Sequence, residues 1–288
     1  MPGKLISGKE VSIKKKQALK EEVTKLKNNG ITPGLAVVLV GNNSASQTYV
    51  RNKQKACQEV GIHSLLLHYD ESISEEFLLE KIHELNNDPI IHGILVQLPL
   101  PKQIDAKNIL EAISPEKDVD GFHPSNVGKM MTGEPSFVPC TPLGIMELLK
   151  EADVSLKGKH AVVIGRSNIV GKPIGQLLLA ADATVTYCHS KTENLRYYTS
   201  QADILVAAVG IANLITADDV KQGAVVIDVG MNRNDAGKLC GDVLTDDVIE
   251  KVAYITPVPG GVGPMTITML LANTVQAAKN IHNVMDLV

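Results

Sequence analysis

Aromatic residues are scarce in this chain: they make up 3% of its 288 residues, and tryptophan is absent. Hydrophobic residues nonetheless account for 44% of the sequence. The core must therefore be built mainly from valine, isoleucine, leucine and alanine, a composition typical of α/β proteins. A chain of 288 residues is long enough for two ordinary domains.

Long apolar runs and an excess of basic charge are also missing. No stretch approaches the roughly 18 apolar residues of a membrane-spanning helix, and no apolar segment follows the N-terminal lysines as it would in a signal peptide. The formal net charge is −4, with acids and bases interspersed, which argues against nucleic acid as a partner. We therefore expect small-molecule chemistry, with no nucleic acid and no membrane involved.

Cysteine is limited to four positions, and these are widely separated. They form no C-x-x-C pair and no Cys/His cluster with the spacing of a metal site. The sequence therefore predicts no metal site, and a reduced, cytoplasmic protein. The four positions are Cys57, Cys140, Cys188 and Cys240.

Alternating helix and strand patterns run through the first third of the chain. Residues 35–40 are continuously apolar, as in a parallel strand buried on both faces. Ser44 or Ser46 can cap the next helix, which Gly61 ends. Such βα units predict a parallel sheet. The predicted strands are 35–40, 64–68 and 90–96, and the predicted helices are 10–29, 44–60 and 75–86.

Proline, glycine, aspartate and asparagine become frequent between residues 99 and 142, where we place a domain boundary. Thr141 as N-cap with Pro142 at the first helical position predicts a helix through about residue 152. The second lobe suits a Rossmann-type sheet with helical crossovers, followed by a final helix from about Met265 to Val284. Its predicted strands lie near residues 160–164, 183–188, 203–209, 224–229 and 253–256.

A glycine turn stands between the apolar residues 161–164 and a helical pattern near Ile174. It reads Gly165-Arg166-Ser167-Asn168-Ile169-Val170-Gly171. A strand, a small-residue turn and a helix in this order let backbone N–H groups and the helix dipole approach a pyrophosphate. Because Ser167 stands where a G-x-G-x-x-G motif has its second glycine, the motif alone is weak. It nevertheless predicts a nucleotide cofactor.

The next predicted strand ends in His189-Ser190-Lys191, where an NAD-binding unit usually places an acid. That acid accepts hydrogen bonds from a free 2′-hydroxyl and repels a 2′-phosphate, whereas Ser190, Lys191 and Arg166 suit the phosphate. The pattern therefore favours NADP. The alternative is that Arg166 and Lys191 are ordinary solvated loop charges.

Candidate catalytic groups lie in the first lobe. Tyr49 and Lys53 share a helix face just beyond the carboxyl end of a strand, where ligands bind in open α/β sheets. An aromatic ring there can stack on a flat substrate, and the ammonium can act as acid, base or electrostatic stabiliser. From spacing alone, Lys53 can equally be one of several solvated lysines, with Arg51 and Lys55 as neighbours.

Two further polar positions follow in the chain. Gln97 ends the strongest apolar strand of the first half, and its amide can donate to and accept from a polar heterocycle. The stretch Asp118-Val119-Asp120-Gly121 is a turn by composition, and a carboxylate there can pair with an amino-heterocycle. For Gln97 the alternative is a surface turn residue.

A glycine-rich loop precedes the terminal helix. It reads Pro257-Val258-Pro259-Gly260-Gly261-Val262-Gly263-Pro264 and holds three glycines between prolines. A helix cap or a linker needs one glycine, whereas three suit close approach of the backbone to a flat ligand.

Together these segments resemble a known family, the bifunctional methylenetetrahydrofolate dehydrogenase/methenyltetrahydrofolate cyclohydrolases. The similarity extends from residue 49 to residue 266, with the motifs in the family's order and spacing. The motifs are Tyr49-Val50-Arg51-Asn52-Lys53, Val96-Gln97-Leu98-Pro99-Leu100-Pro101, Lys117-Asp118-Val119-Asp120-Gly121, Gly165-Arg166-Ser167 with Val170-Gly171-Lys172-Pro173, and Pro257-Val258-Pro259-Gly260-Gly261-Val262-Gly263-Pro264-Met265-Thr266.

This resemblance implies an α/β protein of two lobes. A folate-binding catalytic domain would comprise residues 1–140 with the terminal helix, residues 265–288, and a Rossmann-type NADP-binding domain residues 141–264. The chain would oxidise 5,10-methylenetetrahydrofolate with NADP and hydrolyse the product to 10-formyltetrahydrofolate, in the one-carbon metabolism that supplies purine synthesis. It would be a cytoplasmic homodimer.

The resemblance also implies roles for individual residues. Lys53 would be the catalytic lysine, with Gln97 orienting it or the bridging carbon. Tyr49 would stack on the aminobenzoyl group and Asp120 would bind the amino edge of the pterin. The remaining roles are a folate wall of Pro259, Gly260, Gly261 and Gly263, phosphate contacts from Gly165, Arg166 and Ser167, Ser190 near the 2′-phosphate, and Met231 beside the nicotinamide.

Two alternatives remain at this stage. One is another NADP enzyme of similar lobe arrangement, such as a shikimate-dehydrogenase-like oxidoreductase. The other is a non-catalytic nucleotide-binding or regulatory protein, for which Lys53 and Asp120 would be dispensable.

Overall fold

A computed structural model describes residues 2–234 and 236–284, so that residues 285–288 of the predicted terminal segment lie outside the described residues. The chain forms two compact units. Unit 1 comprises Met1–Ile13 and Thr141–Thr266, and unit 2 comprises Lys14–Cys140 and Ile267–Val288. The division falls within or at the start of three helices: α1 (Gly8–Asn28), α6 (Cys140–Glu151) and α10 (Val262–Ile281).

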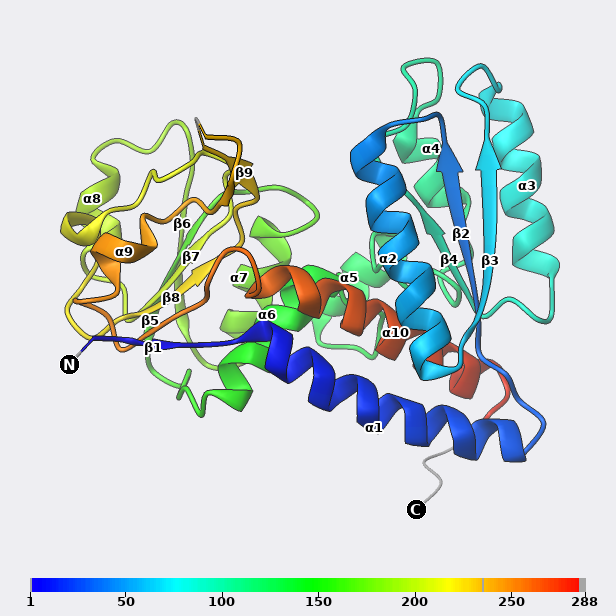
Figure 1. Ribbon diagram of the computed structural model, residues 1–288, viewed down its shortest axis with the longest axis horizontal. Coiled ribbons are helices and arrows are strands. Elements are labelled where there is room, and N and C mark those ends of the chain that lie inside the picture. The colour runs from blue at the N-terminus through cyan, green and yellow to red at the C-terminus, as the bar shows by residue number, and fades with distance from the viewer. Residues whose placement is uncertain (1, 235, 285–288) are drawn as a thin grey trace. The chain divides into compact units, whose positions relative to one another are not determined.

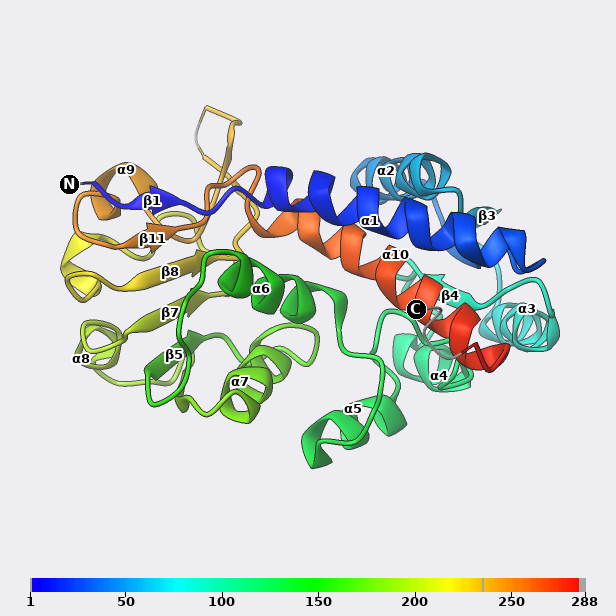
Figure 2. The same cartoon turned by 90° about the horizontal axis from the view of Figure 1, so that it is seen from below.

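Unit 2 is built on a three-stranded parallel sheet of order β3-β2-β4. The central strand is buried along its whole length, and Val37 stands opposite Leu66 and Leu95. Figures 1 and 2 show α2 on one face of this sheet and α3 and α4 on the other. The elements are β2 (Gly34–Val40), α2 (Ser44–Val60), β3 (His63–Tyr69), α3 (Glu75–Asn87), β4 (Gly93–Val96), α4 (Ala106–Ala112) and α5 (Pro124–Thr132).

Several expected element ends differ in the structure, and the terminal helix, for example, runs from Val262 to Ile281. Three of the differences involve turns and caps. β4 begins at Gly93, not at residue 90, because Ile90 is 56% exposed and its N–H donates to the Asp88 side chain in a turn. The cap of α2 is Asn43, whose side chain accepts from the Ser46 N–H, so neither Ser44 nor Ser46 caps this helix.

The third difference is at the start of α6. This helix begins at Cys140, so Thr141 already lies inside it and is not its N-cap. The Thr141 hydroxyl is instead 2.9 Å from the hydroxyl of Thr266 on α10.

Unit 1 contains a six-stranded parallel sheet of order β1-β11-β8-β7-β5-β6, most of which is visible in Figure 2. Its edge strand β1 was not evident from the sequence pattern, because two exposed residues give no period. The strands are β1 (Lys4–Leu5), β5 (His160–Ile164), β6 (Thr184–Cys188), β7 (Ile204–Ala207), β8 (Val225–Asp228) and β11 (Tyr254–Ile255). The predicted α/β fold is thus confirmed, with one more strand than expected.

The first two crossovers of this sheet, from β5 to β6 and from β6 to β7, each contain an α-helix. α7 (Gly171–Ala180) and α8 (Leu195–Thr199) follow β5 and β6. The connection from β7 to β8 has only a short 3₁₀ helix, η1 (Ala217–Asp219). Between β8 and β11 lie a two-stranded ribbon, β9 (Asn232–Arg233) with β10 (Leu239–Cys240), and α9 (Thr245–Val248).

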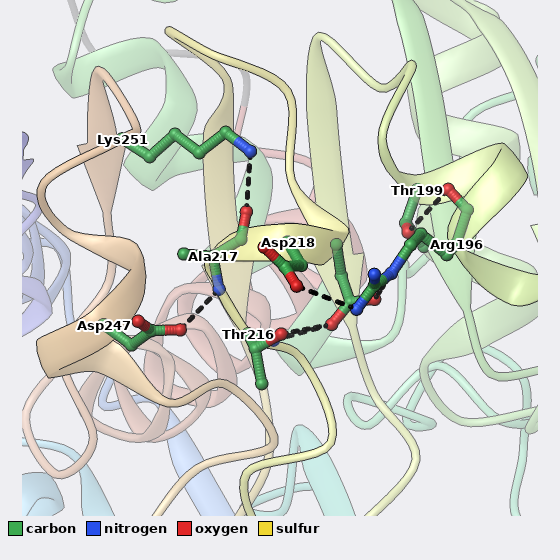
Figure 3. A network of polar contacts seen from close by, with 8 residues as sticks. Arg196, Thr199, Thr216, Ala217, Asp218, Asp247 and Lys251 are labelled. Atoms are coloured by element: carbon green, nitrogen blue, oxygen red, sulfur yellow. Dashed lines mark hydrogen bonds and ion pairs between the residues drawn. The ribbon is translucent and has the colours of Figure 1, made fainter.

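Polar contacts hold η1, the short 3₁₀ helix that stands where a crossover helix is usual, in its position (Figure 3). Arg196 of α8 reaches Asp219 at 3.0 Å and Asp218 at 3.4 Å. From the other side, Asp247 of α9 accepts from the Ala217 N–H at 2.6 Å. The irregular segment after β7 is therefore anchored at its far end.

Across residues 2–234 and 236–284, none of the helices is both long and apolar enough to cross a lipid bilayer.

Candidate active site

Lys53 lies on the buried face of α2. The helix buries Ser46, Val50, Cys57 and Val60, and Lys53 falls between them at the same helical spacing. Its neighbours Arg51 and Lys55 are exposed, whereas Lys53 is half-buried. Lys53 is therefore not one of the solvated lysines of this helix.

Gln97 is the partner of this lysine. The Lys53 Nζ donates to the Gln97 Oε1 at 3.0 Å. The other end of the amide is used as well, since its Nε2 donates to the Leu98 carbonyl at 2.8 Å. This second bond orients the Gln97 amide so that its Oε1 faces Lys53. The contact between Lys53 and Gln97 thus joins α2 to the carboxyl end of β4.

Burial sets the protonation of the groups around Lys53. Desolvation lowers the pKa of Lys53, and the nearby charge of Asp120 opposes this shift. Desolvation also raises the pKa of Asp120, while the nearby charge of Lys53 lowers it. The ammonium and the carboxylate thus stabilise each other's charged forms in a site that disfavours both.

Asp120 is positioned by a tightly bonded loop. Asp118 is buried and accepts from the N–H groups of Phe122 and His123 and from Asn126 Nδ2, and burial raises its pKa to about 6. Gly121 has φ +74°, and a Cβ there would lie 2.6 Å from Pro139 N, so only glycine fits. Asp118 is therefore a scaffold residue of this loop.

Two residues of this site were missed by the sequence analysis. The Cys140 thiol is buried and donates to the Val119 carbonyl at 3.3 Å. Asn273 of α10 donates to the same carbonyl at 2.8 Å and to that of Val138 at 3.2 Å. Both hold the backbone beside Asp120. No local pattern marks them, because their contacts span 21 and 154 positions of sequence.

Tyr49 lies one turn before Lys53 on α2. The residue is 37% exposed, and partial burial raises the pKa of its hydroxyl. A partly exposed aromatic side chain one turn from a half-buried lysine is suited to stacking on a flat ligand.

The glycine turn of unit 1 has the form required to hold a diphosphate. Gly165 has φ +121°, and a Cβ there would lie 2.3 Å from the Ala208 carbonyl oxygen. The Ser167 hydroxyl accepts from the N–H groups of Val170 and Gly171, both at 3.2 Å, at the start of α7. Its own proton can therefore be donated outward. Arg166 and Ser167 are exposed, so the turn fits an anionic ligand at a helix N-terminus.

Ser190 and Lys191 are exposed on the turn that follows β6. The turn is closed by Thr192, whose hydroxyl accepts from the His189 N–H at 2.8 Å and whose N–H donates to the His189 carbonyl at 2.8 Å. A hydroxyl and an ammonium at this position suit a phosphate more than a ribose hydroxyl.

The glycine-rich loop and Met231 also belong to unit 1. Gly261 is required by packing, since a Cβ there would lie 2.5 Å from the Pro257 carbonyl oxygen. Gly260 has φ +105° and no neighbour within 4 Å of a Cβ, and the nearest atom to one at Gly263 is the Met231 sulfur at 4.0 Å. Met231 is 52% exposed. Gly260, Gly263 and Met231 thus leave room for a ligand.

The structure brings together Lys53, Gln97 and Asp120 in unit 2, with Tyr49 on the same helix, and places the predicted cofactor residues in unit 1. Among residues 2–234 and 236–284 there is no group of three or more histidine, cysteine or acidic side chains that could hold a metal ion. The four cysteines are free thiols.

A Rossmann-type sheet with a glycine turn and a separate α/β unit that carries a partly buried lysine define a nucleotide-dependent dehydrogenase of two units. The tetrahydrofolate dehydrogenase/cyclohydrolase catalytic domain matches residues 6–120, and the NAD(P)-binding domain of the same enzymes matches residues 139–282. The chain belongs to the tetrahydrofolate dehydrogenase/cyclohydrolase family.

Individual relatives agree with this assignment. The bifunctional protein FolD of Halalkalibacterium halodurans is 64% identical over 97% of this chain and 100% of its own length. The structure of the FolD dehydrogenase/cyclohydrolase from Campylobacter jejuni is 56% identical, with a TM-score of 0.95 over 96% of this chain and 99% of that one.

A third relative was crystallised with its cofactor. The Trypanosoma brucei methylenetetrahydrofolate dehydrogenase-cyclohydrolase, complexed with NADP and an inhibitor, is 39% identical, with a TM-score of 0.94 over 99% of this chain and 100% of that one. Membership of this family decides against a shikimate-dehydrogenase-like enzyme and against a non-catalytic nucleotide-binding protein.

Proposed function

We propose that this chain catalyses two consecutive reactions. It oxidises 5,10-methylenetetrahydrofolate to 5,10-methenyltetrahydrofolate with NADP, and it hydrolyses that product to 10-formyltetrahydrofolate. The observation that carries the proposal is Lys53, a lysine on the buried face of α2 whose Nζ lies 3.0 Å from Gln97 Oε1. Burial lowers its pKa, and a lysine so placed exchanges its proton readily.

Lys53 assists the hydrolysis as a base. Water adds to the cationic methenyl carbon, and the neutral amine of Lys53 accepts a proton from that water. Gln97 holds the amine in place during this step. The bond from this carbon to N5 then breaks, N5 takes up a proton, and the second proton of the water is released. The positive charge of the methenyl substrate further favours the neutral amine.

Unit 2 supplies two of the proposed folate contacts. Tyr49 stacks on the aminobenzoyl group, and the Asp120 carboxylate pairs with the amino edge of the pterin through two hydrogen bonds. The exposed ring of Tyr49 and the half-buried carboxylate of Asp120 support these roles. The folate wall consists of Pro259, Gly260, Gly261 and Gly263.

When bound, NADP supplies the hydride acceptor for the first reaction. Gly165, Arg166 and Ser167 hold its phosphates, and Ser190 lies near the 2′-phosphate, with Lys191 next to it. Met231 lies beside the nicotinamide. The outward proton of Ser167 and the exposed turn of residues 189–192 support this assignment.

We further propose that residues 1–140 with the terminal helix bind the folate and that residues 141–264 bind NADP. Within the first range, residues 1–13 pack with unit 1. The protein is a cytoplasmic homodimer by its resemblance to the family. Light scattering coupled to gel filtration tests the dimer.

The function is tested with purified protein and 5,10-methylenetetrahydrofolate in the presence of NADP or NAD. We expect NADP to be reduced faster than NAD, with 10-formyltetrahydrofolate as the final product, because no carboxylate follows β6 at residues 189–191 to bind a free 2′-hydroxyl. Absorbance follows the methenyl intermediate and chromatography the final product. Faster reduction of NAD would contradict the cofactor assignment.

A further inference from the structure

The segment after β7 occupies the part of unit 1 where a second cofactor contact is needed. β5 and β7 are neighbours in the sheet, so their carboxyl ends meet at one edge. The glycine turn directly touches the start of this segment, since a Cβ at Gly165 would lie 2.3 Å from the Ala208 oxygen. Because no crossover helix begins here, residues 209–211 lack the support that helix formation would provide.

One carboxylate provides that support. Asp242 is 0% exposed, and its Oδ2 accepts from the N–H groups of Val209 at 2.7 Å and Gly210 at 3.0 Å. Its Oδ1 accepts from the Ile211 N–H at 2.9 Å and from Asn232 Nδ2 at 2.8 Å. Four donors occupy the two oxygens, so this one side chain organises both segments.

Asp242 is in turn held by a second buried carboxylate. Asp228, at the end of β8, accepts from the N–H groups of Asp242 at 2.9 Å and Val243 at 3.0 Å. It also accepts from the Gly230 N–H at 2.9 Å. A Cβ at Gly230 would lie 2.3 Å from the Asp242 Oδ1, so the packing leaves no space for another side chain. Asp242 is thereby rigidly joined to the carboxyl ends of two neighbouring strands.

The segments that Asp242 joins carry exposed apolar side chains. Ile211 is 54% exposed and Met231, next to Asn232, is 52% exposed. Such side chains at the carboxyl edge of a parallel sheet suit the face of a flat ring. In the proposed function, Ser190 after β6 marks the 2′-phosphate end of NADP, so the segments after β7 and β8 take the other end.

We propose that Asp242 is a positioning residue for the nicotinamide end of NADP. It acts through the backbone of residues 209–211 and through Asn232, and it does not act on the adenosine end. This inference rests on the proposed NADP-dependent function.

The test compares two ligands with the full chain. NADPH fills the whole site, whereas 2′-phospho-ADP-ribose lacks the nicotinamide. We expect Asp242→Asn to weaken NADPH binding about tenfold or more, because an amide presents its NH₂ to backbone N–H donors. Binding of 2′-phospho-ADP-ribose should change less than twofold. Both dissociation constants are measured by calorimetry.

The matched control is Asp203→Asn, at the amino edge of the same sheet. Asp203 also accepts from a backbone N–H, that of His160 at 2.9 Å, and pairs with Lys221 at 2.6 Å. This variant should leave the affinity for both ligands unchanged. Equal weakening of both ligands by Asp242→Asn, or no weakening, would overturn the proposal.

A second variant covers the case in which Asp242→Asn does not fold. Asn232→Ala removes one of the four donors and leaves the three backbone bonds of Asp242 in place. It should weaken NADPH binding severalfold with 2′-phospho-ADP-ribose unaffected, and an unchanged affinity for NADPH would contradict the role of Asp242. Failure of the unmodified chain to bind either ligand would instead refute the proposed function.

Discussion

At the scale of single residues, the sequence marks Lys53 as a buried lysine more clearly through the apolar stripe of its helix than through the charges around it. Ser46, Val50, Cys57 and Val60 make a buried stripe with spacings of four and three, and Lys53 completes that stripe. A lysine at a core position costs free energy unless a partner or a function compensates. Gln97 could not be inferred as its partner, because 44 positions of sequence separate the two.

Replacement of Lys53 should impair hydrolysis and leave cofactor binding intact. We expect Lys53→Ala to lower the cyclohydrolase rate by about 100-fold or more, since it removes the proton acceptor. Lys53→Arg should fail equally, because a guanidinium keeps its proton at neutral pH. NADP should still bind. A coupled absorbance assay of methenyl hydrolysis, with the exposed Lys55→Ala as control, measures the effect, and retained hydrolysis would reject the role.

The charge next to Lys53 sets its pH dependence. Burial lowers the Lys53 pKa, so hydrolysis should rise with pH as the neutral amine forms. Gln97→Glu places a carboxylate against the ammonium, which raises the pKa of the lysine. The rising limb of the pH–rate profile should therefore move to higher pH. Gln58→Glu, which adds the same charge at an exposed site of α2, should leave the limb in place; an unmoved limb in Gln97→Glu would contradict this account.

At the scale of elements, the long buried strands and their helices were predictable, and the ends were not. Residues 35–40 and 161–164 are continuously apolar and form most of β2 and β5. The predicted caps were wrong because Ser44, Ser46 and Thr141 are all good cap residues by type. In the structure, a local bond from the Ser46 N–H makes Asn43 the cap of α2, and α6 begins one residue before Thr141.

The cap of α2 gives a direct test. Asn43→Ala removes the bond from its side chain to the Ser46 N–H and should lower the free energy of unfolding by about 1 kcal/mol. Ser44→Ala, at the first helical residue, should change it by a few tenths of a kcal/mol at most. Urea unfolding followed by circular dichroism compares the two variants. An equal loss of unfolding free energy in the two variants would contradict the assignment of Asn43 as the cap.

At the scale of the whole molecule, a pair of histidines links the residue after α10 to the sheet of unit 2. His92 is 2% exposed, accepts from the Gly34 N–H at 3.0 Å through Nδ1, and lies 3.0 Å from His282 Nε2 through its own Nε2. With Nδ1 as acceptor, His92 Nε2 carries the proton and donates it to His282. Burial, His282 and Lys117 lower the pKa of His92 to about 4, and Asp88 opposes the shift.

This pair makes part of the stability depend on pH. Between pH 6.5 and about pH 4 the folded protein binds fewer protons at His92 than the unfolded chain does. The free energy of unfolding therefore decreases as the pH is lowered through that range. The lowered pKa of His92 corresponds to a loss of about 3 kcal/mol in the free energy of unfolding once the pH is below that pKa. Asp118 and Asp228, whose pKa values burial raises to about 6, act in the opposite direction.

The share of His92 is therefore measured as a difference. His92→Gln keeps an acceptor for Gly34 and removes the titrating group. Relative to this variant, the unmodified protein should lose stability as pH falls from 6.5 to 4, as measured by urea unfolding at each pH. Parallel pH profiles for the two proteins would contradict the assignment.

Both units join residues from the beginning of the chain to residues near its end. In unit 1, β1 at residues 4–5 pairs with β11 at residues 254–255, and in unit 2, Glu22 of α1 pairs with Lys279 of α10. On a ribosome that adds about 5 to 20 residues per second, the first partner of each pair waits roughly 10 to 50 seconds for the second. The edge strand β1 and the helix α1 therefore stay without these partners until synthesis nears its end, whereas β2, β3 and β4 can pair among themselves earlier.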